Sequence, residues 1–112
     1  MQHEMKLNRN PFEMIKCGEK IYELRLYDEK RQKLRIGDTI KFTVTDNGQE
    51  SLIKKVKGLH RFDSFTTLYE TLPLDKCGYN CENLQNADPS DMEKYYTKEQ
   101  QRKYGVLAIE LE

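Results

Sequence analysis

The residues best suited to chemistry lie in one short segment, Gly18-Glu19-Lys20-Ile21-Tyr22-Glu23-Leu24-Arg25. A lysine whose pKa is lowered by burial or by nearby cations can act as a base or hold an oxyanion. A carboxylate such as Glu23 can activate water, and the guanidinium of Arg25 can hold a phosphate or carboxylate through two hydrogen bonds. The three side chains therefore indicate hydrolysis of an amide or phosphoester, or binding of an anionic ligand.

The geometry of this segment decides whether the three charges can share a site. Apolar and charged residues alternate from Lys20 to Tyr27, which predicts a half-buried strand. A regular pleat places Glu23 and Arg25 on one face and Lys20 on the other, so Lys20 can join them only from the turn before the strand. The alternative is an exposed ion pair between Glu23 and Arg25, worth at most ~1 kcal/mol, with Lys20 in solvent.

The elements before and after this strand are marked by turn and cap residues. Asn10 can cap a short helix with Pro11 at its first position, and Gly18 ends that helix. Residues 28–34 predict a helical turn, and Gly37-Asp38 predicts a tight turn into the next strand.

A hairpin follows. The strand 39–45 and the segment 51–62 flank Asp46-Asn47-Gly48, a strong turn signal, and Gly58 suits a bulge. The second strand carries most of the remaining basic charge, on Lys54, Lys55, Lys57 and Arg61. These four residues indicate either contacts to RNA phosphates or a charged edge strand that resists aggregation.

The second half of the chain combines helices with one closing strand. Apolar spacing predicts a helix over 64–72, and residues 74–88 form a loop without a clear element. Capping boxes at Ser90-x-x-Glu93 and Thr97-x-x-Gln100 predict two short helices. The apolar segment 106–111 is typical of a central strand. The order of elements predicts an α+β fold, a small mixed β-barrel of about five strands with short flanking helices.

Composition limits the class of protein. A chain of 112 residues is expected to form one domain, residues 1–112, and it contains neither an apolar run long enough for a membrane nor a signal peptide, so a cytoplasmic protein is expected. Residues 1–62 carry 14 Lys and Arg against 9 Asp and Glu, and residues 63–112 carry 5 against 10. This split permits a local positive surface, or attraction between the two halves. The three cysteines, Cys17, Cys77 and Cys81, are an odd set, and the histidines His3 and His60 do not lie at zinc-ligand spacing from them, so we expect free thiols and neither metal nor cofactor.

The motif resembles a known family. Pro11-Phe12-x-x-Ile15-x-x-Gly18-x-Lys20-x-x-Glu23-x-Arg25, the Gly37-Asp38 turn, and Tyr104-Gly105-Val106 near the end together resemble the activating signal cointegrator homology (ASCH) domain over nearly the whole chain. The resemblance implies a PUA-like β-barrel with a cleft beside the motif. It also implies RNA or a nucleoside-like small molecule as the partner.

The family resemblance leaves three functions open. The first is binding of RNA or a nucleotide-like ligand by Lys20, Glu23 and Arg25. The second is a small hydrolase, either an amidohydrolase of a modified nucleoside or a ribonuclease. The amidohydrolases of this kind use a lysine and a threonine of the motif with a later glutamate, which places Lys20, Glu23 and Glu82 in the catalytic set, although Glu23 stands at the threonine position. The third is a protein-interaction module in which the charged motif is structural.

The tyrosines offer stacking platforms for a base. Tyr79 is the better candidate because its loop has no other explanation, whereas the alternation of its strand places Tyr22 in the core. Tyr95 and Tyr96 are expected to cover the barrel with their helix. His60 receives no role.

Overall fold

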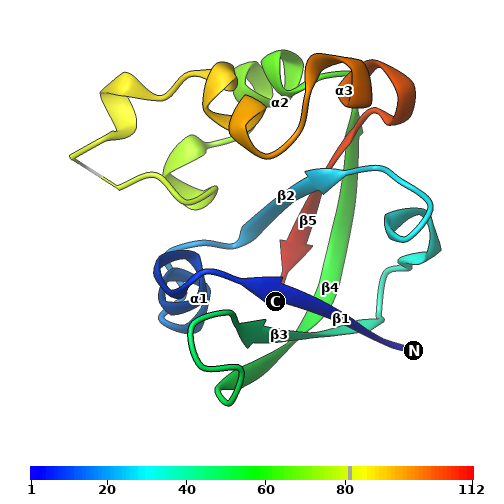
Figure 1. Ribbon diagram of the computed structural model, residues 1–112, viewed down its shortest axis with the longest axis vertical. Coiled ribbons are helices and arrows are strands. Elements are labelled where there is room, and N and C mark those ends of the chain that lie inside the picture. The colour runs from blue at the N-terminus through cyan, green and yellow to red at the C-terminus, as the bar shows by residue number, and fades with distance from the viewer. Residues whose placement is uncertain (81) are drawn as a thin grey trace.

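A curled five-stranded sheet forms the centre of the protein, as the computed structural model shows for residues 1–80 and 82–112 (Figure 1). Its order is β1-β3-β4-β5-β2, and the sheet closes into a half-barrel with helices at its ends. The α+β class and the small curled sheet of about five strands are therefore confirmed. The strands are β1 (Gln2–Leu7), β2 (Tyr22–Leu26), β3 (Thr39–Val44), β4 (Ser51–Phe62) and β5 (Val106–Leu111).

The pairing of the strands makes the sheet mixed. β1 runs parallel to β3, and the other neighbours are antiparallel. The predicted hairpin of β3 and β4 is confirmed, and the β4 register shifts between Val56 and Gly58, as expected of a bulge. The segment that forms β1 was not located from the sequence pattern, because its pairing depends on a strand more than thirty residues away.

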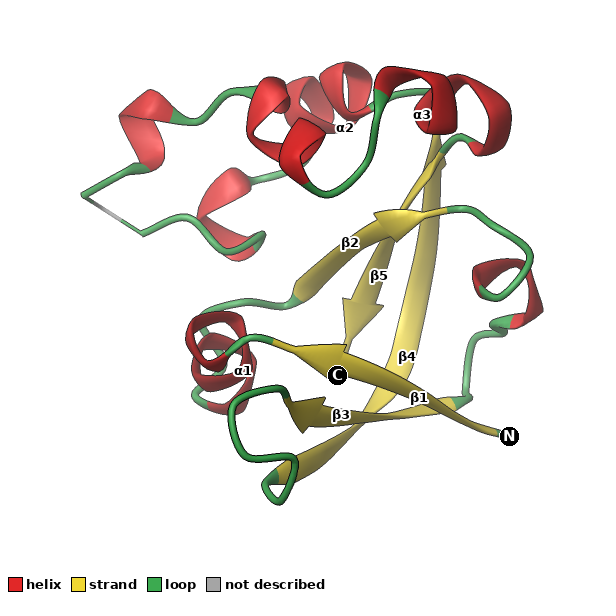
Figure 2. Cartoon of the chain, in the orientation of Figure 1, coloured by secondary structure: helices red, strands yellow, loops and turns green. Residues whose placement is uncertain are grey.

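The helices are short and lie mostly in one layer above the sheet (Figure 2). They are α1 (Arg9–Lys16), α2 (Phe65–Thr71), α3 (Lys98–Tyr104) and four 3₁₀ turns, η1 (Arg31–Lys33), η2 (Leu74–Lys76), η3 (Leu84–Asn86) and η4 (Pro89–Lys94). The capping box of Thr97 and Gln100 is confirmed. Within the described residues, no helix is both long and apolar enough to cross a membrane.

Two of the predicted helix starts were wrong. The first helix begins at Arg9, so its N-cap position is Asn8, two residues before the expected cap at Asn10. The turn η4 is capped by Asp88, whose capping box uses Asp91, and not by Ser90 with Glu93. In both places, neighbouring polar residues could serve equally well as caps, and tertiary contacts decided between them.

The core lies on both faces of the sheet because β5 is buried on both sides. Leu107 and Ile109 pack inside the half-barrel, and Val106 and Ala108 pack under the helix layer. All four are fully buried. The prediction of β5 as an interior strand is confirmed.

Side chains from β2 and from the turn that follows it reach the open edge of β1. Nη2 of Arg25 donates to the carbonyl of Lys6 at 2.9 Å, and Nζ of Lys30 donates to the carbonyl of Glu4 at 2.8 Å. We call this line the seam of the half-barrel. Arg25 therefore bonds to β1 at the seam and also belongs to the charged motif.

Candidate functional site

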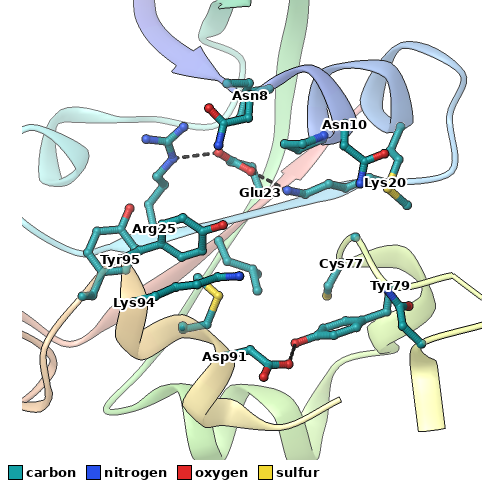
Figure 3. Close-up of a pocket in the computed structure, with 18 of the residues that line it drawn as sticks. Asn8, Asn10, Lys20, Glu23, Arg25, Cys77, Tyr79, Asp91, Lys94 and Tyr95 are labelled. Carbon is teal, nitrogen blue, oxygen red and sulfur yellow. Dashed lines mark hydrogen bonds and ion pairs between the residues drawn. The ribbon is translucent and has the colours of Figure 1, made fainter. Parts of the chain in front are cut away.

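A pocket of ≈ 680 Å³ opens between the sheet and the segment that follows α2 (Figure 3). One wall comes from the end of β1, from α1 and from β2, and the other from residues 69–96. The charged motif lies on the first wall, with Tyr79 and Asp91 opposite (Figure 3). The lining residues are Lys6, Leu7, Asn8, Asn10, Pro11, Met14, Lys20, Glu23, Leu24, Arg25, Tyr69, Cys77, Gly78, Tyr79, Asn83, Asn86, Asp91, Met92, Lys94, Tyr95 and Tyr96.

Lys20 reaches this wall because it precedes the strand. β2 begins at Tyr22, and the backbone N–H of Lys20 donates to the carbonyl of Met14 at 3.0 Å. That bond ties the turn to α1, so the pleat of the strand does not fix the direction of the Lys20 side chain. Lys20 therefore lies in the turn before β2, the position from which the sequence predicts that it can join Glu23 and Arg25.

The three charged side chains form a continuous buried ion-pair chain. Nζ of Lys20 donates to Oε1 of Glu23 at 2.8 Å, and Nε of Arg25 donates to Oε2 of the same carboxylate at 2.7 Å. Their side chains are only 9%, 4% and 15% exposed, in the order Lys20, Glu23 and Arg25. The alternative of an exposed pair with Lys20 in solvent is therefore not what the structure shows.

The carboxylate of Glu23 is held in its ionised form. Burial alone would raise the pKa of Glu23, but the positive charges of Lys20 and Arg25 outweigh burial and lower that pKa. Both carboxylate oxygens already accept a hydrogen bond from a cation. Glu23 is thus a weak general base, and its clearest role is to hold the two cations in place.

Gly78 lies against Lys20 from the opposite wall. A Cβ atom at Gly78 would meet Cδ, Cε and Nζ of Lys20 at 3.5, 3.7 and 3.8 Å. Its φ of 114° also lies where residues with a side chain are strained. Those distances are ordinary van der Waals contacts, so the positive φ, and not a lack of space beside Lys20, accounts for a glycine at this position.

A hydrogen-bonded chain of side chains forms the far wall. The hydroxyls of Tyr69 and Tyr79 lie 2.7 Å apart, and Tyr79 donates to Oδ2 of Asp91 at 2.7 Å. Burial raises the pKa of both tyrosines, so both hydroxyls stay protonated. Tyr79 does lie in the pocket as expected. Its ring is nearly perpendicular to that of Tyr69, at 83°, and its hydroxyl is already hydrogen-bonded to Asp91 within the pocket wall.

Tyr95 is the freer aromatic ring. Its exposed fraction is 56%, it lines the pocket, and Nζ of Lys94 lies 5.2 Å from its ring centroid. The expectation that Tyr95 covers the barrel is wrong, whereas Tyr96 does so and stacks on Phe65 at 6.0 Å. Adjacent residues point in different directions, and the sequence did not reveal which of the two faces the core.

The structure does not bring Glu82 to the pocket. Glu82 is exposed, its backbone N–H donates to Oδ1 of Asn80 at 2.9 Å, and it is not a lining residue. The catalytic set of Lys20, Glu23 and Glu82 is therefore not assembled.

The basic residues of β4 also lie away from the pocket. Lys54 pairs with Ile40 and Lys55 with Thr39, so these two lysines point to opposite faces of the sheet. Nζ of Lys57 lies 3.9 Å from Oε2 of Glu110, and the guanidinium carbon of Arg61 lies 4.0 Å from the ring centroid of Tyr27. Both side chains therefore already have partners within the protein.

The described cysteines are free thiols. Cys17 is exposed, and Cys77 is buried in the pocket wall, where burial raises the pKa of its thiol to about 12. Cys81 lies outside the described residues.

Several lining residues were not expected to contribute. Lys6, Asn8 and Asn10 enter from the start of the chain, and Lys94 enters from η4. Only the polar Asn8 and Asn10 before Pro11 could have drawn attention, and both resemble ordinary helix caps in sequence.

The family of the chain follows from a direct match. The ASCH domain family model matches residues 5–112. The chain belongs to the ASCH domain family. The match spans the motif, the sheet and the closing strand of this ASCH domain. No curated protein matches its sequence.

Solved structures share the fold of this ASCH domain along its whole length. The hypothetical protein PH0355 is 36% identical, with a TM-score of 0.85, over 100% of this chain and 98% of its own. Protein PF0455 from Pyrococcus furiosus is 34% identical, with a TM-score of 0.75, over 100% and 96%. A point mutant of ZmASCH from Zymomonas mobilis is 12% identical, with a TM-score of 0.69, over 98% and 68%, a likeness of fold alone.

Proposed function

We propose that residues 1–112 form one ASCH domain that binds RNA or a nucleotide-like small molecule in the pocket beside Lys20, Glu23 and Arg25. The observation that carries the proposal is the convergence of a buried, fixed charge cluster and an exposed aromatic ring on one pocket. Proteins recognise unpaired nucleotides by stacking the base on an aromatic ring and by hydrogen bonds to polar groups.

The dimensions and lining of the pocket support this ligand class. Its volume of ≈ 680 Å³ falls within the roughly 300–1,000 Å³ of small-molecule sites. Tyr95 offers a ring face, and the amide side chains of Asn10 and Asn86 can supply donors and acceptors to a base edge. Asn8 and Asn83 also line the pocket, but their amide oxygens already accept hydrogen bonds from Thr45 and from the backbone N–H of Asn80.

Binding has more support than hydrolysis by the same residues. Both oxygens of Glu23 are engaged by cations, and Glu82 does not line the pocket. A site with a fixed carboxylate and two directed cations is better suited to holding a ligand than to activating water. A purely structural role, as in a protein-interaction module, is the outcome if no ligand binds.

The test is a titration of labelled single-stranded RNA and of ribonucleotides with the wild type, Tyr95→Ala and Tyr95→Phe. Because Tyr95 is 56% exposed, both variants should unfold at the wild-type urea midpoint. Loss of one stacked base is worth about 1–3 kcal/mol, so Tyr95→Ala should bind about 5- to 150-fold more weakly, and Tyr95→Phe nearly as the wild type. Equal binding by Tyr95→Ala, or no binding at low salt, would contradict the proposal.

A further inference from the structure

The buried charge cluster is not neutral. Lys20 and Arg25 each bring one positive charge, and Glu23 brings one negative charge that its lowered pKa preserves. The cluster therefore carries a net charge of +1 behind little exposed surface. An uncompensated buried charge is costly, so this one favours an anion beside it.

The surrounding pocket wall does not supply that anion. Four cationic side chains, Lys6, Lys20, Arg25 and Lys94, line the pocket with two carboxylates, Glu23 and Asp91. Asp91 lies across the pocket, where its carboxylate accepts from Tyr79 and from the backbone N–H of Asp88 (Figure 3). Among the described lining residues the charge sums to +2.

Donors remain on both cations of the cluster. A guanidinium has five N–H donors, and those of Arg25 make hydrogen bonds to Glu23 and to the carbonyl of Lys6. An ammonium has three, and Lys20 gives one to Glu23. Because both cations line the pocket and flank one carboxylate, an oxyanion on the pocket side can receive hydrogen bonds from each.

We propose that the pocket holds a phosphoryl group of its ligand between Lys20 and Arg25, with Glu23 as the positioning residue for both cations. This inference rests on the proposed function and narrows it to ligands that carry a phosphate. The phosphate of a mononucleotide and the phosphodiester of RNA offer the same oxygens. Because hydrogen bonds between charged groups are the strong ones, the phosphate should strengthen binding at least about tenfold.

Calorimetric titration of the four ribonucleosides, their 5′-monophosphates and one dinucleoside monophosphate tests the inference. The monophosphates should bind the wild type at least about tenfold more tightly than the nucleosides, and this advantage should shrink with added salt. The dinucleoside monophosphate distinguishes a site for a terminal phosphate from a site for an RNA phosphodiester. Only a phosphodiester site should bind the dinucleoside monophosphate more tightly than it binds the nucleoside.

Three variants locate the phosphate. Lys20→Gln should abolish the advantage of the monophosphates, and Arg25→Lys should reduce it by keeping the charge and losing the fork of donors. Lys33→Gln, an exposed lysine away from the pocket, should retain it. If Lys20→Gln does not fold, the inference is tested by Arg25→Lys and by the effect of salt on the affinity of the wild type for the monophosphates.

The outcomes separate this inference from the proposed function. Equal affinity for nucleosides and monophosphates would overturn the phosphate site and leave the nucleoside pocket in place. An advantage that survives in both Lys20→Gln and Arg25→Lys would also overturn it. Failure of every nucleoside, nucleotide and RNA to bind would overturn both.

Discussion

The ammonium of Lys20 and the carboxylate of Glu23 lie 2.8 Å apart, although a regular strand would place them on opposite faces of the sheet. They meet because the strand begins at Tyr22, and the turn before it is bonded to the end of α1. The ion pair therefore depends on the junction of a helix with a strand. A change in either element would move the lysine relative to the pocket.

Removal of the Glu23 charge should destabilise the protein strongly. Glu23→Gln leaves two cations facing each other with almost no solvent, which should lower the free energy of unfolding by about 3 kcal/mol. Urea denaturation followed by circular dichroism measures the change. Glu19→Gln, an exposed neighbour, is the matched control and should stay within about 0.5 kcal/mol of the wild type. A similar small effect of Glu23→Gln would mean that the cluster opens to water.

The same carboxylate should make stability depend on acid pH. The folded-state pKa of Glu23 lies below its ordinary value of 4.5, so the unfolded chain takes up this proton at a higher pH than the folded protein. Its stabilisation is complete above about pH 4.5 and is lost as the pH falls through the lower folded value. The gap in unfolding free energy between the wild type and Glu23→Gln should therefore narrow below pH 4.5. A gap that stays constant down to pH 3 would contradict this expectation.

Gly78→Ala should disturb the pocket through the backbone. At a φ of 114°, alanine is strained, and the expected cost is about 1–3 kcal/mol in urea denaturation. Gly48→Ala, at a φ of 65° in the exposed hairpin turn, is the comparison, since both residues have positive φ and only at Gly78 would the added methyl group contact Lys20. Nucleotide affinity should fall in Gly78→Ala alone. Unchanged affinity would show that the loop does not hold Lys20 in position.

The two described cysteines should differ sharply in reactivity. Burial raises the pKa of Cys77 to about 12, whereas Cys17 is exposed. Compared with an ordinary thiol of pKa about 8.5, Cys77 should react with iodoacetamide at pH 8 more than about a hundredfold more slowly. Peptide mapping of the native protein by mass spectrometry measures both sites, with urea-unfolded protein as the control in which both react. Rapid labelling of native Cys77 would indicate that its loop opens readily.

The sheet was largely predictable because local patterns determine most of its strands. Alternation located β2 and β3, the Asp46-Asn47-Gly48 turn located the hairpin, and a nearly continuous apolar segment indicated the interior position of β5. β1 could not be located in this way, since its parallel partner is distant in sequence and its own pattern is weak. The cap of η4 depended similarly on which of several nearby polar residues faced the backbone.

The site was predictable mainly on the wall that the motif forms, with Tyr79 as the one residue expected from the opposite wall. The residue types of Lys20, Glu23 and Arg25 indicated a shared site, although their spacing on a regular strand would place Lys20 on the other face. Their burial depends on the pairing of all three charges, which the sequence does not reveal. The opposite wall consists of loop and 3₁₀ turns, whose packing against the sheet is set by tertiary contacts. The exposure of Tyr95 and the wall role of Tyr79 therefore became visible only in the structure.

The seam of the half-barrel has a consequence for self-association in solution. Open strand edges are templates on which another chain can add a strand, the first step toward aggregation or domain swapping. Here the outward carbonyls of Glu4 and Lys6 are occupied by Lys30 and Arg25, two charged side chains that an incoming strand would have to displace. These two bonds therefore oppose the addition of a strand at the edge of β1. Arg25, which lines the pocket, thus also opposes fibril-like pairing between copies of the protein.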